Sequence, residues 1–183
     1  METILFLAFT EADGSLSKLA LETLASAQSL AAALPGSKLV AGLVGATVQP
    51  AADAIATSGA TRFLGVAGAE FAQSRYATDA AAAEAVAKSA GATIILAPAG
   101  SRANRTLAGV TQRLGGRIDT HVTALAAADG KPAVTRWYYR QRMEGVLSRT
   151  ARPWVVLLES GCAPAYAGAA GTAAVEGVLV APA

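Results

Sequence analysis

The sequence predicts a three-layer α/β/α domain with a mostly parallel sheet and an antiparallel extension. Over the first two-thirds of its 183 residues, short apolar runs alternate with stretches of helical spacing. In the last third, apolar runs follow one another with no helical stretch between them. The composition is 53% hydrophobic and only 15% charged, which indicates a large buried core and excludes a disordered chain.

Four apolar runs have the composition of buried parallel strands: Ile4–Thr10, Lys38–Val44, Arg62–Ala67 and Thr93–Ala97. A helix is expected after each of them. The first has apolar residues at helical spacing from Leu16 to Leu34, with Ser15 as its N-cap and Pro35-Gly36 as its stop signal. The others are expected over 50–59, 78–90 and 104–114. Such short connections imply right-handed crossovers, so helices should cover both faces of the sheet.

The last third predicts four more strands, at Val122–Ala126, Ala133–Tyr139, Gly145–Ser148 and Trp154–Leu158. Asp129-Gly130 is a strong hairpin signal, so an antiparallel edge should extend the parallel sheet. Residues 160–172 are rich in Gly, Ala and Pro and are predicted to form a loop or linker. A short strand is expected at 175–180. Because the length suits one ordinary domain, residues 1–183 are taken as a single domain.

The composition also limits which classes of binding partner and which cellular compartment are expected. A formal net charge of +2 is too small to indicate nucleic acid or an anionic membrane as a partner. No apolar run approaches the length of a membrane span. One cysteine excludes an internal disulfide and fits a reducing compartment, so a cytoplasmic location is expected.

No catalytic or metal-binding residue is predicted. His121 is the only histidine and has no nucleophile at a telling spacing, and Cys162 has no nearby base. No segment clusters enough ligands for a metal ion. The glycine-rich fingerprints of dinucleotide-binding and phosphate-binding loops do not occur. The chain is therefore predicted not to be an enzyme.

A crevice is nevertheless expected at the carboxyl ends of the first and fourth strands, where ligands bind in doubly wound sheets. The candidate binding residues follow these strands: Thr10, Asp13, Ser101, Arg102 and Arg105. The loop after the fourth strand leads into a helix N-terminus, which attracts anions. The alternative is that these are ordinary connecting loops with solvated arginines.

The segment from Arg136 to Arg142 interleaves aromatic and basic side chains. Such a pattern can stack bases and bind phosphates, and it is also enriched at protein interfaces. The low net charge disfavours nucleic acid, so an interface is the favoured interpretation. The alternative is a strand edge with solvated arginines.

The order of these motifs resembles the electron transfer flavoprotein alpha subunit. The stretch from Thr93 to Ala124 carries an apolar strand ending in Ala97-Pro98, then a helix, then a short Asp-containing apolar element. The stretch from Arg152 to Ala165 is similar to the family's strand that ends in a Pro-Gly-x-x-Pro loop. The resemblance spans nearly the whole chain and corresponds to the N-terminal domain. The signatures of the C-terminal FAD-binding domain do not occur in this sequence.

The resemblance implies an adenine nucleotide hydrolase-like fold with strand order 3-2-1-4-5. It implies the scaffold and docking half of a FAD-containing electron carrier between dehydrogenases and an acceptor. The implied partners are a beta-like subunit and a FAD-binding domain, and FAD is expected to be held mainly outside this chain. Residues expected to face the flavin or the partner are Arg136, Tyr139, Arg140 and Arg142. The alternatives left open are a stand-alone domain that binds AMP or ATP and a homodimeric interaction module.

Overall fold

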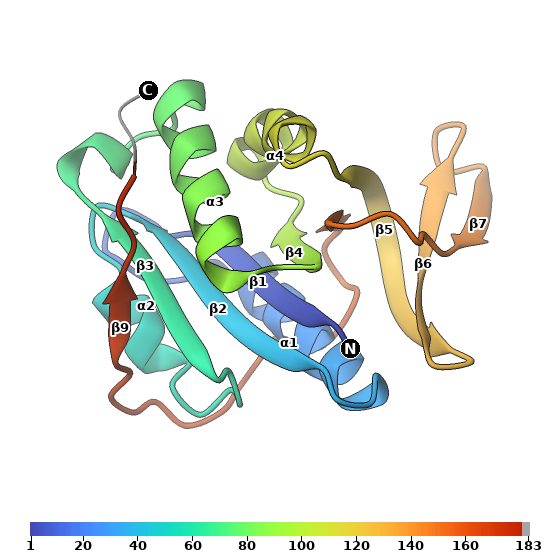
Figure 1. The fold of residues 1–183 in the computed structure, drawn as a ribbon, viewed down its shortest axis with the longest axis horizontal. Helices are drawn as coiled ribbons and strands as arrows, with labels where there is room; N and C mark the ends of the chain where they lie inside the picture. Colours follow the sequence, from blue (N-terminus) through green and yellow to red (C-terminus); the bar gives the residue numbers. More distant parts are fainter. Residues whose placement is uncertain (181–183) are drawn as a thin grey trace.

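The computed structural model describes residues 1–180 and shows a nine-stranded sheet with helices on both faces (Figure 1). The strands are β1 (Thr3–Phe9), β2 (Lys38–Gly45), β3 (Arg62–Ala67), β4 (Ile94–Pro98), β5 (Arg117–Ala128), β6 (Lys131–Tyr138), β7 (Met143–Leu147), β8 (Trp154–Leu158) and β9 (Val175–Gly177). The helices are α1 (Lys18–Ala33), α2 (Gln49–Ala54), α3 (Tyr76–Ala90) and α4 (Ser101–Arg113), with a 3-10 turn η1 (Ala69–Phe71). The predicted fold class is confirmed.

The strand order is β7-β6-β5-β8-β4-β1-β2-β3-β9. The central order 3-2-1-4 is the expected one. The strand beside β4 is β8, which pairs parallel to it, and the earlier strand β5 lies one place further out. Burial explains this placement, because all five residues of β8 are buried whereas β5 exposes many of its residues. A continuously apolar strand belongs in the interior of a sheet, and an alternating one belongs toward its edge.

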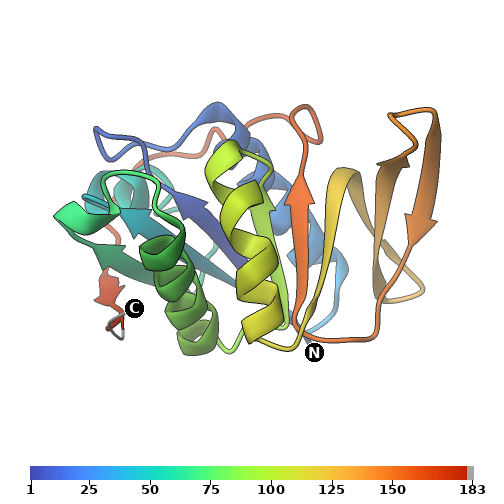
Figure 2. The same cartoon turned by 90° about the horizontal axis from the view of Figure 1, so that it is seen from above.

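Alternate residues of β1 build the two halves of the core. Ile4 and Phe6 pack with buried residues of α1 and α2 on one face. Leu5 and Leu7 pack with buried residues of α3 and α4 on the other. Figure 2 shows α3 and α4 together on one side of the sheet, with α1 on the opposite side. Because both faces of the strand meet helices, β1 is apolar throughout.

The largest differences from the sequence-based expectation lie at three helix boundaries. The N-cap of α1 is Ser17, whose Oγ accepts from the N–H of Ala20 at 3.2 Å, whereas the N–H of Ser15 donates to the Asp13 carboxylate. Helix α2 is a short segment and ends at Ala54. Helix α4 begins at Ser101, directly after the extended Gly100. Its first turn therefore lies at the edge of the crevice beside β1.

The predicted hairpin joins β5 to β6, and Asp129 and Gly130 at its turn both have positive φ. Strand β5 pairs parallel to β8 with its first half and antiparallel to β6 with its second. A bulge at His121, whose φ is 57°, separates the two halves. The β6–β7 hairpin projects from the end of the molecule (Figures 1 and 2).

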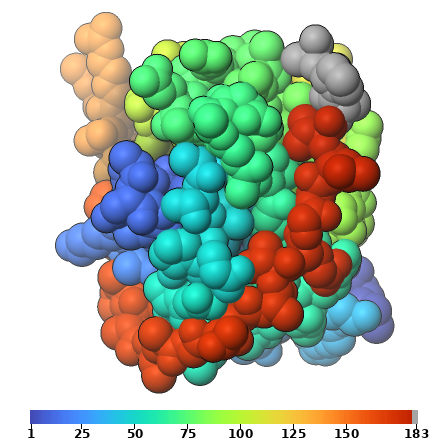
Figure 3. All heavy atoms as spheres, turned by 90° about the vertical axis from the view of Figure 1, so that its left-hand side faces the viewer, coloured from blue at the N-terminus to red at the C-terminus, as the bar shows by residue number. Residues whose placement is uncertain are grey.

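The segment between β8 and β9 has no helix or strand from 161 to 174 and crosses the molecule along α1 and α2. The N–H of Tyr166 donates to the Leu21 carbonyl at 3.1 Å, and the N–H of Ala173 donates to Asp53 at 2.9 Å. It ends in β9, which pairs parallel to β3 at the edge opposite the hairpin. Figure 3 shows this C-terminal segment, in red, running over the surface. Within residues 1–180, no helix is long and apolar enough to cross a membrane.

Candidate functional site

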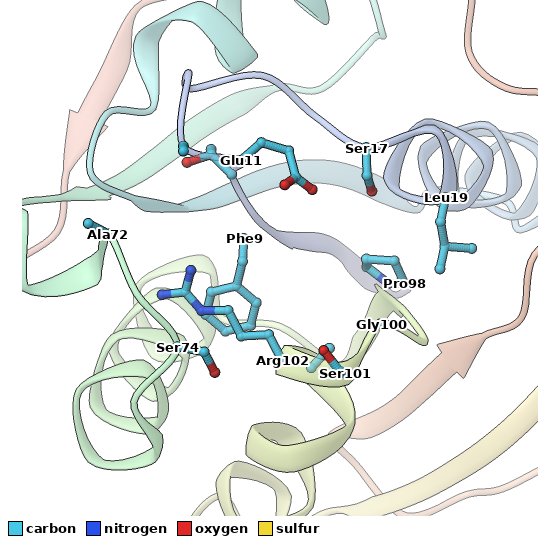
Figure 4. A pocket seen from close by; sticks show the side chains of 13 residues that line it. Phe9, Glu11, Ser17, Leu19, Ala72, Ser74, Pro98, Gly100, Ser101 and Arg102 are labelled. Atoms are coloured by element: carbon cyan, nitrogen blue, oxygen red, sulfur yellow. The ribbon is translucent and has the colours of Figure 1, made fainter.

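A crevice of about 400 Å³ opens at the carboxyl ends of β1 and β4, where the sequence analysis expected one. In Figure 4, Glu11 and Ser17 lie on one side, and Arg102 and Ser74 lie on the other. The crevice is lined by Phe9, Thr10, Glu11, Ala12, Ser17, Leu19, Ala72, Ser74, Pro98, Gly100, Ser101, Arg102 and Ala103. The first turn of α4 borders it, and Gly100 supplies no side chain to cap that helix.

The Arg102 side chain is engaged in hydrogen bonds within the protein, and it links α4 to α3. Its Nε and Nη2 donate to the Asp79 carboxylate at 2.8 and 2.6 Å, and Nη2 also donates to the Phe71 carbonyl at 2.8 Å. Its guanidinium carbon lies 4.5 Å from the centre of the Phe9 ring. Asp79 on α3 is fully buried. The pair therefore fastens α4 to α3 beneath the crevice, and its positive charge is largely balanced.

The structure brings only part of the predicted crevice set together. Thr10, Ser101 and Arg102 line the crevice, whereas Asp13 and Arg105 are not among its lining residues. The Thr10 hydroxyl donates to the Thr47 carbonyl at 3.0 Å. Both Asp13 and Arg105 are exposed on the surface.

Sequence reasoning did not identify Phe9 or Ser74 as crevice residues. Glu11 lies one residue after Thr10, in the loop after the first strand that was expected to line the crevice, and the structure places it there. Ser74 comes from the irregular segment between η1 and α3. Nothing local to that segment indicates that it reaches the crevice.

A second cluster lies where β5, β6 and β8 meet. Asp119 on β5 is fully buried and accepts from Arg136 at 3.0 Å, from Arg149 at 2.8 Å and from the Trp154 indole at 2.8 Å. A further bond from Arg149 Nε reaches the other carboxylate oxygen. The donors come from β6, from β8 and from the segment before β8, so one carboxylate on β5 joins the hairpin to the parallel sheet.

The electrostatic balance at Asp119 favours its charged form. Burial by itself would raise the pKa of this carboxyl group. The hydrogen bonds from Arg149, Trp154 and Arg136 and the charge of Arg149 all act in the opposite direction, and together they outweigh burial. The pKa of Asp119 is therefore lowered from its ordinary value. The arginine that sequence reasoning missed here is Arg149, which lies 30 residues from Asp119.

The predicted flavin- or partner-facing residues lie on or beside the β6–β7 turn. Tyr139, Arg140 and Arg142 are exposed, whereas Arg136 is partly buried and binds Asp119. Tyr139, Arg140 and Gln141 all have positive φ, from 49° to 65°. A pocket of about 450 Å³ lies beside this turn, and Arg142 is not among its lining residues.

The hairpin also gathers exposed apolar side chains. Among residues 1–180, the large hydrophobic side chains most exposed to solvent are Met1, Tyr76, Tyr138, Tyr139, Met143, Val146 and Leu179. Four of these seven lie on the hairpin or its turn. Tyr139 and Val146 are each 75% exposed. Scattered apolar residues are ordinary on a protein surface, but a concentration on one projecting element is typical of an interaction surface.

His121 and Cys162 both contact Glu159, one at its carboxylate and the other at its backbone carbonyl. The Nδ1 atom of His121 lies 2.9 Å from a carboxylate oxygen of Glu159. The Cys162 thiol donates to the Glu159 carbonyl at 2.8 Å. Burial, followed by the charges of Glu159 and Glu22, raises the pKa of Cys162 to about 11. The thiol therefore stays protonated near neutral pH and is a poor nucleophile there. No group of three or more possible metal-ligating side chains occurs within residues 1–180.

Comparison with known proteins adds the family. No curated protein sequence matches the chain. The model of the electron transfer flavoprotein domain matches residues 4–183, which is nearly the whole length. This match agrees with the helix-covered, mostly parallel sheet and its antiparallel extension. The chain therefore belongs to the electron transfer flavoprotein domain family.

Proposed function

We propose that this chain is the alpha-subunit-like scaffold and docking half of an electron transfer flavoprotein, working in the cytoplasm. In this role it pairs with a beta-like subunit and a FAD-binding domain, and the assembly carries electrons from dehydrogenases to an acceptor. The observation that carries the docking role is the projecting β6–β7 hairpin, which concentrates exposed apolar side chains.

The chemistry of the hairpin supports this role. Tyr138, Tyr139, Met143 and Val146 supply apolar contact area, and Arg140 and Arg142 are exposed beside them. Aromatic side chains, Met and Arg are the residue types enriched at protein interfaces. Asp119 anchors the base of the hairpin through Arg136, so this surface is held in place before a partner arrives. Pre-organisation of this kind lowers the entropy lost on binding.

The crevice does not fit the pyrophosphate of FAD. Glu11 lines it and would repel a pyrophosphate, and Arg102 is already bound to Asp79 and to the Phe71 carbonyl. We therefore assign the main FAD site to another polypeptide of the assembly, which would supply the electron chemistry.

The test is complex formation with a purified electron transfer flavoprotein beta subunit, followed by size-exclusion chromatography and calorimetry. We expect a one-to-one complex with the wild-type chain. Because central apolar anchors dominate interface energies, Tyr139→Ser combined with Val146→Ser should weaken binding by about tenfold or more. Added FAD should remain bound after desalting only when the FAD-binding domain is also present.

Leu179→Ser is the matched control, because Leu179 is 96% exposed and follows β9 at the opposite edge of the sheet. This variant should bind like the wild type. Equal weakening by the hairpin and control variants would overturn the placement of the interface. A homodimer of the chain with no affinity for the beta subunit would instead support the self-association alternative.

A second candidate function is nucleotide binding in the crevice. The observation that favours it is the pocket itself, which brings the first turn of α4 and the Glu11 carboxylate, an acceptor for a ribose hydroxyl, into one crevice. AMP should then raise the melting temperature, because a ligand that binds only the native state stabilises it. Ser101→Glu should abolish this rise by repelling the phosphate, while favouring the helix itself. Gln112→Glu, at the far end of α4, makes the same charge change and should leave the rise intact.

A further inference from the structure

A pocket of about 450 Å³ lies beside the β6–β7 turn, far along the sheet from the crevice. It is lined by His121, Arg136, Trp137, Tyr138, Tyr139, Arg140 and Gln141. Two arginines, one histidine and three aromatic rings therefore meet in one place. None of these lining residues is a carboxylate, whereas Glu11 lines the crevice. The pocket thus offers hydrogen-bond donors that can bind an anion, together with the flat apolar surface of the aromatic rings.

Arg136 retains unused hydrogen-bonding capacity. Its Nη1 donates to Asp119 at 3.0 Å, and its guanidinium carbon lies 4.6 Å from the centre of the Tyr138 ring. Its Nε is buried and has no hydrogen-bond partner among the described residues. A ligand in the pocket therefore meets the 20% of the Arg136 side chain that is exposed, with the unpaired Nε buried behind it. Asp119 and Tyr138 hold the guanidinium beside the pocket.

The turn itself has a left-handed backbone. Tyr139, Arg140 and Gln141 share positive φ, and the N–H of Arg142 donates to the Tyr138 carbonyl at 3.1 Å. A turn closed four residues apart uses only the N–H of its last residue. Turns in which successive residues have such a backbone can form concave surfaces of N–H groups that bind anions.

The nearby carboxylates orient the lining side chains. A carboxylate oxygen of Glu159 lies 2.9 Å from His121 Nδ1, which leaves Nε2 on the opposite edge of the ring. Glu144 accepts from the Trp137 indole at 3.2 Å and fixes that ring. Asp119 is fully buried behind Arg136. Arg140 is exposed at the turn, so it is the cation best able to meet an incoming anion.

We propose that this pocket binds a phosphate ester attached to a planar ring, as in a flavin or adenine mononucleotide. The phosphate contacts Arg140, Arg136 and His121, and the ring packs on the aromatic side chains. Stacking on aromatic rings beside phosphate-binding arginines is a general way to hold nucleotides. The site belongs to this chain alone, so its test does not depend on a beta subunit.

The experiment is an NMR titration of the ¹⁵N-labelled chain with flavin mononucleotide and with riboflavin, its phosphate-free counterpart. The chain has two tryptophans, so two indole N–H resonances report on different places. The Trp137 resonance should shift on titration, and that of the buried Trp154, whose indole binds Asp119 behind Arg136, should shift less. Riboflavin should bind at least tenfold more weakly. AMP and adenosine form a second pair, which distinguishes adenine from flavin as the preferred ring.

Arg140→Gln and Arg142→Gln provide a matched pair of variants. Both arginines are exposed, two residues apart in the same turn, but only Arg140 lines the pocket. Because a hydrogen bond to a charged group is among the stronger ones, Arg140→Gln should weaken mononucleotide binding by about tenfold, and Arg142→Gln should leave it nearly unchanged. The proposal is overturned if the two variants weaken binding equally, if riboflavin binds as tightly as its phosphate, or if the Trp137 resonance stays fixed at millimolar ligand.

Discussion

Replacing Asp119 with alanine is expected to lower the free energy of unfolding by about 4 kcal/mol, the range found when one partner of a buried ion pair is removed. Asp119 is fully buried and receives hydrogen bonds from Arg136, Arg149 and Trp154. Without the carboxylate, two arginines would face each other with no balancing charge. Their side chains are 20% and 35% exposed, so water can relieve part of this penalty.

Urea denaturation of the two proteins measures this loss. Glu144→Gln is the matched control, because Glu144 is an exposed carboxylate on the same hairpin that accepts a single bond from Trp137. The control should change stability by less than about 1 kcal/mol. Equal effects of the two substitutions would show that Asp119 does not organise the base of the hairpin.

The same carboxylate gives the stability a pH dependence of known sign. The pKa of Asp119 is lowered in the folded protein, so the unfolded chain takes up a proton at higher pH than the folded one does. Its stabilising contribution is therefore complete above the ordinary Asp pKa of about 3.9 and is lost as the pH falls below it. The stability difference between the wild type and Asp119→Asn should shrink in that acidic range. A difference that stays constant down to the acid unfolding transition would contradict this assignment.

Replacing Asp79 with alanine is expected to lower the free energy of unfolding by about 3 kcal/mol. Asp79 is fully buried and binds the Arg102 guanidinium through two hydrogen bonds, and it also accepts from the N–H of Arg75 at 3.2 Å. Its loss would leave Arg102, only 16% exposed in its side chain, without its counter-charge. It would also free the start of α3 from α4.

A double-mutant cycle with Arg102→Met isolates the pair. Because the methionine removes the unbalanced charge and keeps much of the packing on Phe9, the double variant should be more stable than Asp79→Ala alone. Thermal and urea unfolding provide the measurement. If the effects of the two substitutions on the free energy of unfolding are additive, the Asp79–Arg102 pair makes no specific contribution to stability.

The local pattern of the sequence was sufficient for most of the elements. The apolar runs located β1, β2, β3 and β8, and Asp129-Gly130 located the hairpin turn. These features depend on residues a few positions apart, through side-chain periodicity and the backbone preferences of single residues. Helix starts were less accurate, because Ser15 and Ser17 are both suitable caps and only packing selects between them.

The sequence by itself therefore determined the layered fold class, the family resemblance and the approximate place of the crevice. The tertiary structure decided that β8 lies between β4 and β5, because a strand buried along its whole length is stable only in the interior of the sheet. It also decided that Arg102 pairs with Asp79 and that Asp119 binds both Arg136 and Arg149. The partners in these pairs lie 17 to 30 residues apart in the sequence. No local pattern marks such partners, because buried charges are matched across the folded core and not along the chain.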